Sequence, residues 1–243
     1  MIMMVDSGPM VLTDGPESVA LSDMALIEVT ELVKRTRGRI SRASGGNRFL
    51  DLLEEGLVPL ERLAWLAGEE FRIVDSDRRS FGLLSSRFPQ VPAGEFFLSL
   101  AQGEDHAFTL LPDYAAALGW SEKDLISYEP RPRAQSYPAY LAQRAVFGTS
   151  SEVALAMLAN LEEWGSYCAR TATALRTRYG LSEEAVAFFS YFAETPPGFI
   201  EQATAVIAAG LEAGEDPDAA VRAADFLHAY EADFWATLAE GLP

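Results

Sequence analysis

The chain has 243 residues, 49% apolar and 11% aromatic, and its 36 Asp and Glu against 19 Lys and Arg give a formal net charge of −17. This apolar content is ample for one large hydrophobic core. The charge argues against binding to nucleic acids and anionic membranes, because both need clustered cationic side chains. No apolar run approaches the roughly 20 residues that span a bilayer. We therefore expect neither nucleic acid nor membrane as a partner.

Cysteine usage indicates the compartment. Cys168 is the single cysteine, so an internal disulfide and a thiolate zinc site are both excluded. The first 14 residues lack the basic stretch followed by an apolar stretch that is typical of a signal peptide. We expect a soluble, cytoplasmic protein.

Apolar residues recur at helical spacing along nearly the whole chain, and the alternation typical of strands is scarce. Spacing and capping residues predict helices over 22–37, 48–55, 59–86, 93–118, 136–147, 150–179, from 182 onward, 199–213 and 217–240. We expect Pro112 to interrupt the fourth of these and a short acidic segment to follow Gly119. The prediction is an all-α fold with one domain over residues 21–243, after a poorly ordered segment over residues 1–20.

Motifs for metal, phosphate or serine chemistry are absent. His106 and His228 are the only histidines, and neither has a partner at metal-ligand spacing. No glycine-rich phosphate loop and no Gly-x-Ser-x-Gly turn occurs. We expect no metal and no bound cofactor, with His106 in solvent and Cys168 as a buried apolar thiol.

Two helices carry polar groups next to aromatic rings. On the long helix Asn160, Glu163, Trp164 and Tyr167 share one face. Either this face lines a pocket, or Glu163 lies in solvent and only Trp164 enters the core. On the last helix Glu231 shares a face with Phe234 and Trp235. A carboxylate in that position could act as an acid, a base or a cation anchor, or be an ordinary surface glutamate.

Four short motifs carry a family resemblance. Residues 130–137, Pro-Arg-Pro-Arg-Ala-Gln-Ser-Tyr, resemble the Pro-x-Pro-x-Ala-x-Ser-Tyr stretch of TenA-type thiaminase II proteins. Gly148 with Glu152, the Tyr-Glu-x-x-Phe-Trp run at 230–235 and the helix entry at 58–63 follow the family's order and spacing. The resemblance extends from about residue 47 to residue 242. It implies the heme-oxygenase-like all-α fold, a small-molecule pocket between the helices and a homo-oligomer.

The resemblance also implies roles for single residues. The family's pyrimidine-binding aspartate falls on Glu70, its pocket tyrosine on Tyr137 and its catalytic glutamate on Glu231. We therefore expect Tyr137 and Glu231 to be catalytic, with Glu231 moving the proton and Glu70 anchoring the ligand.

Three aligned positions differ from the family. Its nucleophilic cysteine falls on Asn160, and two of its tyrosines fall on Trp164 and Phe192. An amide cannot attack as a thiolate does, and Cys168 lies about 12 Å further along the helix axis. We therefore do not expect the covalent chemistry of thiaminase II.

The same fold hosts non-haem iron oxidases, whose histidine positions fall on Phe192 and Phe199. Because phenylalanine cannot ligate iron, the motif does not predict a dinuclear iron site. An oxidase is thus the third hypothesis. The first is acid/base hydrolysis or deamination of an amine-bearing or cationic heterocycle, and the second is a non-catalytic binding or sensing protein. The expected substrate-binding residues are Glu70, Asn160, Glu163, Trp164, Tyr167 and Phe192.

Overall fold

The computed structural model describes residues 23–43 and 45–243, and all regular secondary structure in these ranges is α-helical. The helices are α1 (Asp23–Ala43), α2 (Arg48–Glu54), α3 (Leu60–Arg87), α4 (Ala93–Ala117), α5 (Glu122–Ser127), α6 (Ser136–Phe147), α7 (Ser150–Tyr179), α8 (Ala187–Phe192), α9 (Phe199–Glu212) and α10 (Pro217–Ala239). The predicted segment over residues 1–20 lies outside the described residues.

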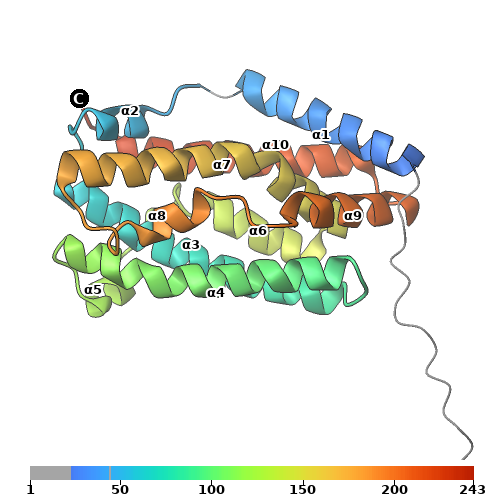
Figure 1. Ribbon diagram of the computed structural model, residues 1–243, viewed down its shortest axis with the longest axis horizontal. Helices are drawn as coiled ribbons and strands as arrows, with labels where there is room; N and C mark the ends of the chain where they lie inside the picture. The colour runs from blue at the N-terminus through green and yellow to red at the C-terminus, as the bar shows by residue number, and fades with distance from the viewer. Residues whose placement is uncertain (1–22, 44) are drawn as a thin grey trace, which may run out of the picture.

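The long helices lie side by side along the long axis of the molecule (Figure 1). α3 packs along α4, and α7 packs against α10 and α9. α6 contacts both α3 and α10, and so joins these two halves of the bundle. α1 lies across α9 and α10 at the top of the view.

Local capping explains several helix ends. The Asn47 side chain accepts a hydrogen bond from the Leu50 N–H at the start of α2. Thr149 and Glu152 form a reciprocal capping box at the start of α7, and Gly180 ends that helix with a φ of +68°. These residues are readable in the sequence, which is why the predicted and observed bounds agree so closely there.

Two helices differ from the sequence prediction. α1 runs to Ala43 rather than to residue 37, because Ile40 is buried against the bundle and Arg39 forms an ion pair with Asp225. The predicted interruption at Pro112 is wrong, since α4 is continuous through it. The flanking Leu111 is fully buried, and its packing offsets the hydrogen bond that proline cannot make.

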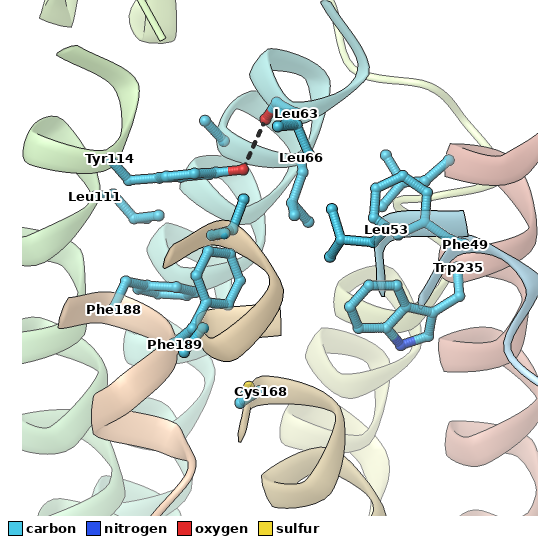
Figure 2. Close-up of a cluster of buried hydrophobic side chains, with 14 of the residues drawn as sticks. Phe49, Leu53, Leu63, Leu66, Leu111, Tyr114, Cys168, Phe188, Phe189 and Trp235 are labelled. Atoms are coloured by element: carbon cyan, nitrogen blue, oxygen red, sulfur yellow. Dashed lines mark hydrogen bonds between the residues drawn. The ribbon is translucent and has the colours of Figure 1, made fainter. Parts of the chain in front are cut away.

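Buried apolar side chains form two clusters. Figure 2 shows the first, in which the Tyr114 ring stands edge-on to Phe189 with centroids 5.1 Å apart, and its hydroxyl donates to the Leu63 carbonyl at 3.1 Å. Cys168 is fully buried in this cluster, as expected. The second cluster joins α1, α9 and the other ends of α3, α4 and α7. Tyr137 packs against both clusters and so marks the boundary between them.

A buried glutamate holds the Pro-Arg-Pro-Arg connector against α3. Glu69 is fully buried and accepts hydrogen bonds from the Tyr128 hydroxyl at 2.7 Å, the Arg131 N–H at 2.9 Å and the Gln135 side chain at 2.6 Å. Tyr128 also lies where a Cβ on Gly68 would be, since such an atom would come within 2.5 Å of its ring. These contacts fix the start of α6, and therefore the position of Tyr137.

Replacing Glu69 should destabilise the protein strongly. Glu69→Ala leaves three partly buried donors without their acceptor, which we expect to cost about 3 kcal/mol. The melting temperature should fall by roughly 6–12 °C in a chain of this size. Glu129→Ala is the matched control, because Glu129 is exposed on the same connector. Equal melting temperatures for the two variants would contradict the structural role of Glu69.

Candidate functional site

An internal cavity of about 270 Å³ lies between the two apolar clusters. Side chains from α3, α4, α6, α7, α8, α9 and α10 line it, and most of them are apolar. Its aromatic lining residues are Phe81, Tyr137, Trp164, Tyr191, Phe192, Phe199 and Phe234. This inner cavity is large enough for a small organic molecule.

Carboxylates from three helices face the inner cavity. Glu70 and Asp77 come from α3, Glu104 from α4 and Glu231 from α10, while Glu194 follows α8. No Lys, Arg or His occurs among the described residues that line it. The protein therefore supplies negative charge to this cavity and no positive charge from its walls.

Three of these carboxylates keep an oxygen without a hydrogen-bond partner. The atoms are Glu70 Oε1, Asp77 Oδ1 and Glu231 Oε1, on residues that are 1%, 3% and 5% exposed. Buried acceptors are nearly always paired in folded proteins. The contrast with the neighbouring Glu69, which accepts from three donors, is direct. No side-chain donor among the described residues acts on Glu70, whereas Trp235 and Tyr137 lie close enough to Glu231 and Asp77 to lower the pKa values of these two acids.

Burial shifts the proton affinity of these acids. Desolvation raises the pKa of Glu70 and of Asp77 well above the usual range, and the nearby Glu104 charge adds to the rise. Desolvation also raises the pKa of Glu104 to about 8. Part of the acidic cluster is therefore protonated at neutral pH while the cavity holds no cation.

Glu231 accepts a hydrogen bond from Asn160, the residue that the sequence resemblance aligns with the nucleophilic cysteine of the TenA-type proteins. The Asn160 side-chain amide donates to Glu231 Oε2, while Asn160 Oδ1 has no partner. Burial raises the pKa of Glu231 to about 7, and the bond from Asn160 opposes the rise. A carboxyl group with this pKa can both accept and release a proton near neutral pH.

Glu231 also lines a second, outer cavity of about 360 Å³. Glu163, Tyr167 and His228 line this outer cavity, and Glu163 Oε2 lies 3.0 Å from His228 Nδ1. The Tyr167 hydroxyl donates to Glu163 Oε1 at 2.7 Å. The hydrogen bond with Glu163 raises the pKa of His228.

The structure divides the predicted site residues between the two cavities. Those that line the inner cavity are Glu70, Tyr137, Asn160, Trp164, Phe192 and Glu231. Glu163 and Tyr167 line the outer cavity instead. The division arises because α10 packs against the predicted face of α7, with Trp235 between Trp164 and Tyr167 at ring distances of 6.2 and 5.7 Å.

Sequence reasoning missed three of the cavity acids, Asp77, Glu104 and Glu194. Asp77 lies two helical turns after Glu70, so the shared face of α3 was a readable signal. Glu104 had no such signal, because its place at the cavity depends on how α4 packs on α3.

Within the described ranges, no group of three or more His, Cys, Asp or Glu side chains is arranged to hold a metal ion. Phe192 and Phe199, at the histidine positions of the iron oxidases, contribute rings to the inner cavity. None of the described helices is both long and apolar enough to cross a bilayer.

Comparison with solved structures identifies the fold. A heme oxygenase-like domain of unknown function from Shewanella denitrificans is 16% identical, with a TM-score of 0.67 over 89% of this chain and 93% of that one. A TenA homologue from P. horikoshii is 17% identical, with a TM-score of 0.68 over 86% of this chain and 97% of that one.

A TenA homologue from Pseudomonas syringae is 11% identical, with a TM-score of 0.67 over 97% of this chain and 98% of that one. No family model matches the sequence, and no curated protein matches it significantly. The comparisons confirm the predicted all-α, single-domain heme-oxygenase-like fold, shared with the TenA homologues.

Neutralising a cavity carboxylate should not weaken the ligand-free protein. Glu70→Gln and Glu231→Gln each remove a buried charge or a protonation requirement, so we expect an unchanged melting temperature or a rise of roughly 2–4 °C, for about 1 kcal/mol. The control is Glu162→Gln, which removes an exposed ion pair with Arg37 and should lower stability slightly. Clear destabilisation by both cavity variants would contradict the proposed role of these residues.

The stability of the ligand-free protein should fall as the pH rises from about 5 to about 8. In this range folded Glu231, with a pKa raised from 4.5 to about 7, and Glu104, with a pKa raised to about 8, bind more protons than the unfolded chain does. His228 acts in the same direction, because its raised pKa gives stability that is lost as the pH passes through it.

Melting curves across this pH range test the prediction. The double variant Glu104→Gln/Glu231→Gln should have a shallower decline than the wild type, with the His228 contribution remaining. A wild-type melting temperature that peaks at pH 8 would contradict the burial of these acids.

Proposed function

We propose that this TenA-like protein binds a small amine-bearing or cationic heterocycle in its inner cavity. One observation carries the proposal: the cavity presents buried carboxylate oxygens without partners, and none of the described residues that line it has a cationic side chain. An ammonium or a protonated ring nitrogen would donate to these oxygens and balance their charge. An anion, or a ligand without a hydrogen-bond donor, would leave these buried oxygens unpaired and their desolvation cost uncompensated.

The walls of the cavity favour a planar ligand. The Trp164 and Phe192 rings lie 5.8 Å apart with 65° between their planes, and both line the cavity. A flat heterocycle can stack on either ring, and a positive charge is attracted to the ring faces. Glu70, across the cavity on α3, is the proposed anchor.

The proposed chemistry is acid/base hydrolysis or deamination with Glu231 as the proton-transfer group. A water oxygen bonds to the ring carbon that bears the amino group, while ionised Glu231 takes a proton from that water. The carbon–nitrogen bond then breaks, and Glu231 returns the proton to the departing ammonia. The step needs neither a thiolate nor an oxidant, and Glu231 ends as it began. Tyr137, which lines the same cavity, is the second proposed catalytic residue.

Binding without turnover is the alternative. It is favoured by Asn160 at the nucleophile position and by Cys168, whose full burial raises its pKa well above the usual range. The two functions share the ligand and differ only in its fate.

Native mass spectrometry of freshly purified protein tests the proposal. We expect a small bound cation that is released on denaturation. The released compound is then returned to the protein for a long incubation: ammonia release indicates the enzyme, and unchanged recovery indicates the binding protein. An anionic co-purifying ligand, displaced by no amine, would contradict the proposal.

Displacement of the 5-aminomethyl nitrogen of 4-amino-5-aminomethyl-2-methylpyrimidine should be near background, because this is the thiolate-dependent reaction of the family and Asn160 cannot act as a thiolate. Formation of the 5-hydroxymethyl product by wild type and by Glu231→Gln measures this, with Glu162→Gln as a control away from both cavities. Robust wild-type turnover that Glu231→Gln abolishes would show that the fold performs this reaction without the nucleophile.

A further inference from the structure

A second acidic end of the inner cavity lies two helical turns from Glu70. Asp77 is seven residues further along α3, about 10.5 Å in axial rise, and both residues line the same cavity. Ile73 and Val74, which lie between them in sequence, also line it and are apolar. The cavity wall on α3 is therefore acidic at two points with an apolar surface between them.

The environment of Asp77 is that of a binding group rather than a structural one. Asp77 is 3% exposed, and its Oδ1 has no hydrogen-bond partner. Glu104 from α4 lines the cavity, and its charge is the strongest acting on both Asp77 and Glu70. The Tyr137 hydroxyl from α6 partly opposes the rise in the Asp77 pKa, and Asp77 Oδ1 has no hydrogen-bond partner.

A ligand with one cationic group would satisfy only one end. If it binds between Glu70 and Glu231, Asp77 Oδ1 stays buried without a partner two turns away. The structural carboxylate Glu69, by contrast, accepts hydrogen bonds from three donors. The second end requires a second donor of its own.

We propose that the ligand of the inner cavity carries two cationic groups, one held by Glu70 and Glu231 and the other by Asp77, with Glu104 close to both ends. This inference rests on the proposed function and specifies its ligand class: a diamine whose two charges are separated by a hydrocarbon linker. The apolar surface of Ile73 and Val74 fits a hydrocarbon linker between the two charges.

Calorimetric titration with simple amines tests the proposal. The probes are straight-chain diamines from 1,4-diaminobutane to 1,8-diaminooctane, each paired with the monoamine of the same chain length. We expect the best diamine to bind at least tenfold more tightly than its monoamine, which is about 1.4 kcal/mol. Titration near pH 7 in buffers of different ionisation enthalpy should also show more protons released by the diamine, because a second carboxyl group must ionise.

Variants assign the two ends. Asp77→Asn should lower the affinity for the diamine to that for the monoamine, whereas Glu70→Gln should weaken binding of both probes. Asp77→Ser provides a second variant at the far end if Asp77→Asn does not fold. Asp105→Asn is the matched control, since Asp105 follows Glu104 in α4 but forms an exposed ion pair with Arg78.

The outcomes separate the two proposals. Equal affinity and equal proton release for diamines and monoamines would overturn the two-charge inference and leave the proposed function standing. Failure of every amine to bind would overturn the two-charge inference, while the proposed function is tested separately by the co-purifying ligand. A diamine advantage that persists in both Asp77→Asn and Asp77→Ser would also overturn the assignment of the second end.

Discussion

The free-energy cost of burying carboxylates away from water is the constraint on which the connector, the start of α6 and the inner cavity all depend. Each buried acid must find a donor or hold a proton. Glu69 takes the first course, and its bonds to the 128–135 segment fix the start of α6. Burial favours the second for Glu70 and Asp77, because it raises their pKa values well above the usual range. α3 thus carries both a carboxylate that stabilises the fold and two carboxylates with an unpaired oxygen facing the cavity.

Glu231 occupies the wall between two compartments. Its carboxyl group lines the inner cavity and the outer one, where Glu163 and His228 lie. A proton on Glu231 can therefore be exchanged on the outer side while a ligand fills the inner side. This separation of ligand path from proton path would suit an acid/base role, and it does not conflict with simple binding.

Sequence patterns predicted the helices better than the site. Caps such as Asn47 and Gly180 are local, so they could be read without the tertiary structure. The prediction that Pro112 interrupts the helix was wrong because the packing that keeps α4 continuous is not local. The resemblance brought Glu70, Asn160 and Glu231 to one cavity, but nothing in the sequence showed that α10 divides the face of α7. The outer position of Glu163 follows from that packing.

The adjacency of Glu69 and Glu70 limits how this chain can change length. Successive helix residues point about 100° apart, so one carboxylate faces the connector while the next faces the cavity. One residue inserted between Pro59 and Glu69 would rotate both and turn the wrong acid toward each environment. Insertions and deletions should therefore be rare in the first three turns of α3 among relatives of this chain, whereas the turn after α9 is free of this constraint.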